Sequence, residues 1–395
     1  MAIGICLSLG WFVLESCECD ETKEQNFPGF WVTCVNNKPT LMTYNDNNAT
    51  VVTQEQAGNF DPAEWDCSHD ANSPSYKGSE DRPPFQVSTP SGPGGPIARP
   101  HATGSVYAFV PQRLINLPFL PHVPQNTNPT CSSSTPDVFQ TNQLNAAVNR
   151  WHTCPFSLVA TIPVVAAPLQ VEITPDGGTA LVTSFNSAVN FIDLSTNKVR
   201  YTLMTDPSIH PHGLAISPDG TRAYITSFVP NNPLVAVIDM TSRAIIATSP
   251  TALQYPHGAT LTPDGSQLWI TSPLSAGVDV IDTLSGTHVF TLNINETTDV
   301  AFNSTGTLAF ITSTATVPGT VVEVDTSNYQ TITTFTVGSG PTDIKMSYGD
   351  QWLVVNNNTD TTVSVIDLVR NTVVTVPVGA NGFRGPGPTG ISFVQ

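Results

Sequence analysis

The feature that most constrains the fold of this chain is a motif that recurs in its second half. Three copies begin with proline and end in Pro-Asp-Gly, at residues 168–177, 211–220 and 256–265, and weaker copies begin at Thr297 and Pro341. Each copy is followed by a second β-rich run, a third run that ends in aspartate, and a fourth run. These aspartates lie 42 to 46 residues apart: Asp193, Asp239, Asp282, Asp325 and Asp367. Units of four short strands in about 43 residues predict a β-propeller in which each unit is one blade.

The repeat is punctuated by turn-forming residues. In Pro-Asp-Gly, proline presets φ, aspartate bonds its own backbone and glycine accepts a positive φ. The aspartate after each third run suits the turn into the fourth strand. A residue that is present in every blade indicates a turn device rather than a catalytic group. Helical periodicity of useful length is missing, so we predict an all-β protein with four-stranded antiparallel blades.

Counting the units predicts seven blades. Residues 168–385 hold five of them, and Pro388–Phe393 reads as a first strand whose three partners are found at residues 30–53. Pairing of this C-terminal strand with the N-terminal strands would close the ring and leave no open sheet edge there. The predicted domains are therefore a leader or disordered N-terminus at residues 1–26 and a single propeller at residues 27–395.

One further blade completes this count. It begins at Pro84–Gly92, a copy of the repeat start that is one residue shorter, and ends with a fourth strand at residues 157–163. Between them, residues 113–156 are rich in Pro, Asn and Ser and are predicted to be a loop insertion within this second blade. Because this blade lacks most of the turn-forming residues of the repeat, a six-bladed ring is the alternative.

Several motifs resemble those of a known family. They are the Pro-x-Gly start, the Pro-Asp-Gly turn, the run Tyr224-Ile-Thr-Ser227 and the run Val237-Ile-Asp239. Over about residues 157–395 the chain resembles the YVTN-repeat β-propellers, and more specifically bacterial extracytoplasmic proteins of this kind. Lactonase-like propellers are a more distant resemblance. The resemblance implies the propeller fold and an extracytoplasmic setting, and it does not imply one activity.

Composition bears on partners and location. The net charge of −17, from 14 Lys+Arg against 31 Asp+Glu, argues against nucleic acid as a partner. No run of 18 apolar residues occurs, so we expect no transmembrane helix. The apolar run 2–14 resembles a signal-peptide core but lacks the basic start, and a truncated or mis-started reading frame is the alternative.

The cysteines lie outside the clear repeats. All are in the first 154 residues and none forms a C-x-x-C motif: Cys6, Cys17, Cys19, Cys34, Cys67, Cys131 and Cys154. This distribution favours disulfides that join irregular loops, with Cys131–Cys154 and Cys34–Cys67 as candidate pairs, although sequence alone does not determine the connectivity. We therefore predict a protein that is secreted, periplasmic or at the cell surface.

The candidate site lies at the start of the innermost strands, where propellers place the mouth of their central channel. The second position of the repeat is His212 and then His257 in neighbouring blades, and the third position is Asp299 and then Asp343 in the next two. His210 lies two residues before His212. Imidazole and carboxylate groups that converge at one mouth are ligands for a divalent metal, with His212 and His257 as its proposed ligands. The alternative is that the histidines cap first-strand backbone and the aspartates accept from turn amides.

Two functions follow from these residues. The first is a binding or scaffold protein that holds a protein or glycan partner through its rim loops and channel mouth. The second is a metal-assisted hydrolase or lyase at the same mouth, for which no catalytic residue is assigned. Beyond the divalent metal, no cofactor is indicated.

Overall fold

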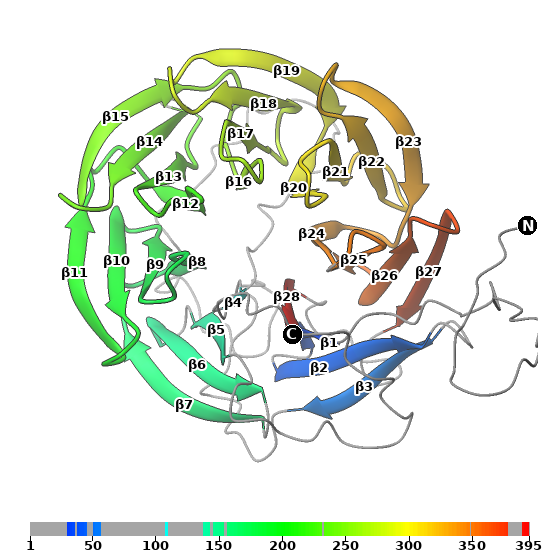
Figure 1. Ribbon diagram of the computed structural model, residues 1–395, viewed down its shortest axis with the longest axis horizontal. Coiled ribbons are helices and arrows are strands. Elements are labelled where there is room, and N and C mark those ends of the chain that lie inside the picture. The colour runs from blue at the N-terminus through cyan, green and yellow to red at the C-terminus, as the bar shows by residue number, and fades with distance from the viewer. Residues whose placement is uncertain are drawn as a thin grey trace, which may run out of the picture.

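The computed structural model describes residues 30–35, 38–45, 50–56, 107–109, 137–142, 145–153, 156–230, 233–347, 349–377 and 389–394. In segments 30–56, 107–109, 152–157 and 389–394 this description covers the backbone. All regular elements within these residues are β-strands, β1 to β28, and they form a ring of small sheets around a central axis (Figure 1). The all-β propeller with four-stranded antiparallel blades is confirmed.

Six of the sheets are made of consecutive strands, and each runs outward from the axis in strand order. One contains β4 (Tyr107–Phe109), β5 (Asp137–Asn142), β6 (Ala147–Thr153) and β7 (Phe156–Pro163). The next contains β8 (Pro168–Ile173), β9 (Thr179–Ser184), β10 (Ala188–Asp193) and β11 (Lys198–Met204). The third contains β12 (Pro211–Ile216), β13 (Arg222–Ser227), β14 (Leu234–Asp239) and β15 (Ala244–Pro250).

The other three continue around the ring. One contains β16 (Ala259–Leu261), β17 (Gln267–Ile270), β18 (Ala276–Asp282) and β19 (His288–Asn295). The next contains β20 (Thr297–Phe302), β21 (Leu308–Ser313), β22 (Thr320–Asp325) and β23 (Gln330–Thr336). The last contains β24 (Pro341–Met346), β25 (Trp352–Asn357), β26 (Thr362–Asp367) and β27 (Thr372–Pro377).

The remaining sheet joins the two ends of the described chain. β28 (Thr389–Val394) pairs with β1 (Phe30–Val35), which continues into β2 (Lys38–Asn45) and β3 (Thr50–Gln56). Its antiparallel register places Phe30 opposite Val394. The predicted pairing of the C-terminal strand with N-terminal strands is therefore present. The expected count of seven treats this sheet as a blade, whereas counting only the sheets of consecutive strands gives six.

One prediction about the weakly marked blade is wrong. Residues 113–156 were expected to be a loop insertion, but they contain β5 and β6, the second and third strands of this blade. Their apolar residues are fully packed, with Val138, Phe139 and Trp151 at most 1% exposed. No Pro-Asp-Gly turn marks these strands, so the surrounding Pro, Asn and Ser obscured them. The proposed start at Pro84–Gly92 lies outside the described residues.

The core lies between neighbouring blades. The second and third strands of each fully described blade are almost wholly buried, whereas the fourth strand, such as β11 or β15, is largely exposed. Side chains on facing sheets meet, as where Phe139 and Ile162 pack with Val171 and Val182 of the next blade. Continuous apolar runs in the middle strands are therefore explained by sheets that are covered on both faces.

The predicted turn devices are confirmed. Asp219 accepts hydrogen bonds from Ser217 Oγ at 2.6 Å and from the Thr221 amide at 3.0 Å, while Gly220 has φ of +70°. These bonds hold the pKa of the Asp219 carboxyl at about 2. The aspartate after the third strand works in the same way, since Asp239 accepts from the Ser242 amide at 2.7 Å. The repeated aspartates are thus part of the scaffold.

Candidate functional site

The innermost strands carry the predicted site residues at a break in their hydrogen-bond ladder. In β12 the register with β13 shifts between Pro211 and Leu214, and similar shifts occur in β8, β20 and β24. The second and third residues of these strands can therefore bond across to the neighbouring blade instead of within their own sheet.

A threonine on the second strand makes that connection from blade to blade. Thr226 Oγ1 donates to the carbonyl oxygen of His257 at 2.9 Å, although His257 belongs to the next blade. Three other junctions have the same bond: Thr141 to Leu169 O at 2.9 Å, Thr183 to His212 O at 2.8 Å and Thr271 to Thr298 O at 2.8 Å. At these four junctions a threonine near the end of the second strand therefore joins neighbouring blades, a role that sequence analysis missed.

The two histidines extend this ladder of contacts. His212 is 7% exposed, and its Nδ1 lies 3.3 Å from His257 O, while His257 Nδ1 lies 3.2 Å from Thr298 O. Because a carbonyl can only accept, each Nδ1–H donates. Burial, followed by the neighbouring His257, lowers the pKa of His212 well below 6.5. The alternative that the histidines cap first-strand backbone is confirmed for these ring atoms.

The structure does not test the metal role of His212 and His257. Their rings are adjacent, with centroids 4.3 Å apart. Within the part of the chain that the structure describes, no three or more His, Cys, Asp or Glu side chains are grouped so that they could hold a metal ion. The divalent metal therefore stays a prediction that rests on the two imidazoles.

Asp299 and Asp343 occupy the third position in the next two blades. Asp299 Oδ1 accepts from the Val300 amide at 2.8 Å, and its Oδ2 accepts from the Ile344 amide of the following blade at 3.1 Å. Asp343 Oδ2 accepts from Thr342 Oγ1 at 2.8 Å. Asp299 accepts from amides, but these amides lie within β20 and β24 and not in turns as expected, so the carboxylate links two first strands.

The blades with histidines have glycine at this third position. A Cβ on Gly213 would lie 2.2 Å from His257 O, and one on Gly258 would lie 2.6 Å from Thr271 Oγ1. The first distance, to a backbone oxygen of the next blade, is not sterically tolerable, and a Cβ on Gly258 would also lie 3.0 Å from Thr298 O of the blade after it. The innermost strands therefore approach one another closely at these two glycines. By contrast Gln170, the residue at this position in β8, bridges to the next blade through its Oε1, which accepts from the Leu214 amide at 2.8 Å.

Charged side chains on the innermost strands of three blades interact electrostatically with one another. They are Glu172 on β8, Asp299 on β20, and Asp343 and Lys345 on β24, which we call the axial cluster. All four are partly buried. Burial is the main cause that raises the pKa of Glu172 to about 7, against the opposing effect of Lys345. Burial also raises the pKa of Asp299, and Asp299 is the main cause that raises the pKa of Lys345.

Sequence analysis missed Glu172 and Lys345, although a signal existed. Both are the fifth residue of a first strand, two residues beyond Gln170 and Asp343. Alternate residues of a strand share one face, so the third and fifth positions lie on the same face. The fifth residue of each first strand, considered together with the third, therefore points to both Glu172 and Lys345.

A second group, which we call the stacking cluster, surrounds the histidines. The rings of Phe185 and His210 stack with centroids 4.7 Å apart, and His210 Nδ1 lies 3.0 Å from Phe185 O. In the next blade Phe228 contacts His212 at 4.9 Å, Tyr255 at 5.2 Å and His257 at 6.0 Å between centroids. The six members of the cluster are Phe185, His210, His212, Phe228, Tyr255 and His257, and all except His212 are partly exposed. The structure therefore brings His212 and His257 together against Phe228, while His210 stacks on Phe185 of the preceding blade.

The aromatic members are not required by the repeat. In four blades the first amide after the second strand donates to the carbonyl of the residue before the first strand, as from Phe228 to His210 at 3.0 Å. The same bond is made by Thr314 to Glu296 at 2.9 Å and by Asn358 to Gly340 at 2.8 Å, where neither residue is aromatic. Because the scaffold needs only the backbone here, aromatic rings in two adjacent blades indicate a local function.

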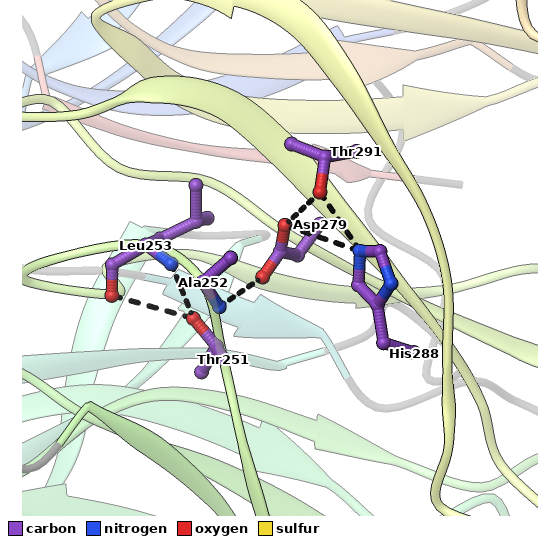
Figure 2. A network of polar contacts seen from close by, with 6 residues as sticks. All are labelled: Thr251, Ala252, Leu253, Asp279, His288 and Thr291. Carbon is purple, nitrogen blue, oxygen red and sulfur yellow. Dashed lines mark hydrogen bonds and ion pairs between the residues drawn. The ribbon is translucent and has the colours of Figure 1, made fainter.

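A third polar network lies farther out, in the blade of β16 to β19 (Figure 2). Asp279 is fully buried, and it accepts from the Ala252 amide and from Thr291 Oγ1, both at 2.7 Å. His288 Nε2 lies 2.8 Å from Thr291 Oγ1 and 3.7 Å from Asp279 Oδ1. In another blade Ser364 fills this position, where it contacts Thr375 Oγ1 at 2.7 Å and accepts from the Gly338 amide at 3.2 Å. This network is therefore a structural clip that recurs between blades.

The described residues include no helix of the length and hydrophobicity that a membrane span requires. The predicted disulfides are not tested. Of the seven cysteines, the structure describes only the backbone of Cys34.

Comparisons with known proteins support the fold and no more. No known family model matches the chain, and no curated protein matches it. Among solved structures the chain is similar to the hydrazine synthase of Kuenenia stuttgartiensis, with a TM-score of 0.57 and 20% identity over 64% of this chain and 85% of that chain. Because 1705 solved chains match, the likeness identifies a widely shared architecture. The YVTN resemblance stays a prediction, and the fold that the comparison shows is the β-propeller.

Proposed function

We propose that this protein is a binding protein that takes its partner at the end of the ring where the innermost strands begin. The stacking cluster is the observation that carries the proposal. Its partly exposed rings occupy loop positions in three adjacent blades at which the equivalent residues of other blades are Thr314, Glu296 and Gly340. Rigid aromatic rings give much contact area at small entropic cost, which suits recognition.

The contacts of the cluster favour binding over catalysis. The Nδ1 atoms of His210, His212 and His257 all face backbone carbonyls, so these nitrogens are used in holding the rings in place. His212 is kept neutral by burial and so adds no charge to the surface. A preorganised stacking surface on a rigid scaffold is what a binding protein requires.

The experiment compares the protein with a Phe228→Ala variant on arrays of immobilised peptides and glycans. The matched control is Phe290→Ala, because Phe290 is 39% exposed and stacks on Tyr329 at 4.8 Å on the outermost strand of its blade. We expect Phe228→Ala to lose at least about tenfold in affinity for a partner that the control variant still binds. A partner that both variants bind with equal affinity would show that the binding surface lies elsewhere.

A metal-assisted hydrolase or lyase is the second candidate, favoured by the axial cluster. A carboxyl group with a pKa of about 7 beside Lys345 is an arrangement found in acid–base catalysis. Quantifying divalent metal in the purified protein separates the candidates. One equivalent of metal that is lost in His212→Ala combined with His257→Ala would favour the enzyme, whereas no stoichiometric metal is expected from a binding protein.

The proposal includes an extracytoplasmic location and YVTN-type ancestry. Support comes from the 11% of charged residues, the Pro-Asp-Gly and Val-Ile-Asp motifs, and the confinement of all cysteines to the first 154 residues. Mass spectrometry after alkylation without reduction tests the location. Disulfide-linked peptides are expected, and full alkylation of every cysteine would argue for a reducing compartment.

A further inference from the structure

The loop that joins β15 to β16 carries Tyr255, one of the rings of the stacking cluster, and side chains hold this loop just before that residue. The Ala252 amide donates to Asp279 Oδ2 at 2.7 Å. The Gln254 amide donates to Ser275 Oγ at 2.8 Å. Both acceptors belong to the blade that the loop enters, so this blade fixes the path of the chain into Tyr255.

Tyr255 needs this support because its backbone conformation is unfavourable. Its φ is +53°, in the left-handed region where a bulky side chain is rare. The residues just before the first strands of three other blades, Ala167, Glu296 and Gly340, also have positive φ, so the scaffold imposes this conformation. A strained residue persists where the contacts around it over-determine its position. The anchored loop therefore holds tyrosine in a conformation that suits glycine, at a place where its ring contacts Phe228 with centroids 5.2 Å apart.

Asp279 is the buried group that supplies the first of these anchors, and both of its oxygens are used (Figure 2). Oδ1 accepts from Thr291 Oγ1, and Oδ2 accepts from the Ala252 amide, each at 2.7 Å. His288 lies beyond Thr291, with its Nε2 atom 2.8 Å from Thr291 Oγ1. Thr291 thus orients the carboxylate so that its second oxygen faces the loop.

Two other blades have the same clip with a neutral acceptor. Asn190 and Ser364 stand, like Asp279, three residues before the repeated aspartate. Their contacts with the loop amides are 3.3 Å and 3.2 Å long, against 2.7 Å for Asp279. Carboxylates accept shorter and stronger hydrogen bonds than neutral groups do. The scaffold therefore does not require a carboxylate here, and the shortest of the three bonds holds the loop that carries Tyr255.

Resting on the proposed function, we infer that Asp279 is a positioning residue for the binding surface. By holding the Ala252 amide, it keeps the Tyr255 ring against Phe228 and so sets the arrangement of rings that a partner meets. His257 lies two residues beyond Tyr255 in the same held segment. The effect of Asp279 on a partner passes through the loop.

A double-mutant cycle tests this role on the affinity for the partner found on the arrays. Asp279→Ala should weaken binding about tenfold, and so should Tyr255→Ala. Asp279→Asn should restore most of the affinity, because Asn190 makes the same contact in its own blade. Since Asp279 acts through Tyr255, the double variant should bind no more weakly than Tyr255→Ala alone. Losses that multiply in the double variant would overturn the inference.

Ser364→Ala is the matched control, because it removes the same clip from a blade outside the stacking cluster. It should lower the stability of the ring and leave the affinity for the partner unchanged. If Ser364→Ala weakens binding as much as Asp279→Ala does, the effect reflects general stability and the positioning role is wrong.

Amide hydrogen exchange measures the hold on the loop without any partner. Asp279→Ala should speed exchange at the amides of Gln254 and His257 by at least about tenfold, while Ser364→Ala leaves it unchanged. Asp279→Asn should give a smaller change in the same direction, and it serves as the test if Asp279→Ala does not fold. Exchange as slow as in the parent would overturn the inference.

The two proposals fail in different ways. A loop that loosens in Asp279→Ala, in a protein whose partner does not depend on Phe228, would refute the proposed function and leave the hold of Asp279 on Tyr255 in place. A partner that depends on Phe228, with a loop that Asp279→Ala does not loosen, would refute the positioning role alone.

Discussion

Replacing Glu172 by glutamine tests the electrostatics of the axis. The substitution keeps the shape of the side chain and removes its ability to ionise. In the folded protein burial raises the pKa of Glu172 from 4.5 to about 7, so the folded state retains a proton that the unfolded chain releases. Between these two pKa values, stability therefore falls as the pH rises, and it levels off above about pH 7.

The size of this effect follows from the two pKa values. The difference between 4.5 and about 7 corresponds to about 3 kcal/mol of unfolding free energy across the whole window. Most of it, about 2.5 kcal/mol, is lost between about pH 5 and about pH 8. Glu172→Gln cannot lose it, so the variant should become more stable than the parent as the pH rises.

Urea unfolding of parent and variant at about pH 5 and about pH 8 measures the difference directly. The control is Glu296→Gln, because Glu296 is an exposed glutamate on the same ring. A Glu172→Gln variant whose stability changes with pH as the parent's does would refute the reasoning. It would mean that Glu172 is solvated, and that the charged groups of the axial cluster do not interact.

Three further experiments, two on substitutions and one on a deletion, test the scaffold. Gly213→Ala should lower the unfolding free energy by about 3 kcal/mol, because the new Cβ would lie 2.2 Å from His257 O. The control Gly178→Ala, whose Cβ meets nothing closer than 3.4 Å, should lower it little. Equal melting temperatures for the two variants would contradict the tight junction. Asp279→Ala should lower the unfolding free energy, measured by urea unfolding, by about 3 kcal/mol, because it leaves the Ala252 amide unpaired. Asp279→Asn should restore part of this loss. An Asp279→Ala variant as stable as the parent would disprove the structural role of the network. Deleting residues 387–395 removes β28 from the sheet of β1 and should lower the melting temperature by about 10 °C or more, so a truncated protein that melts like the parent would exclude the closure.

Local signals made much of the fold predictable. Pro-Asp-Gly forms its turn through its own side chains, so Asp219 could be assigned without knowing the ring. The pairing of β28 with β1 could be inferred because each end of the chain held an incomplete repeat. The strands β5 and β6 were missed because their blade lacks such local marks, and burial alone identifies them.

The site was only partly predictable because its parts come from different blades. His212 and His257 were visible as repeat positions, but their bonds to the next blade depend on the register shift of each first strand. The charges of Glu172 and Lys345 lie 173 residues apart in the chain and interact only after the ring has formed. Phe228 became notable only when the same loop position could be compared in several folded blades.

The junctions between blades are of two kinds. At Gly213 and Gly258 the spacing is set by direct steric contact, which neither pH nor salt can alter. At Gln170 and Asp299 the spacing is set by a polar side chain that spans the gap, and one of these is an acid whose pKa is raised. A change of solution conditions would therefore act on the Asp299 joint and leave the histidine side rigid. The junctions at Gly213 and Gly258, next to the aromatic residues, are therefore fixed by steric contact. The junction between β20 and β24 depends instead on the protonation of the Asp299 carboxyl group.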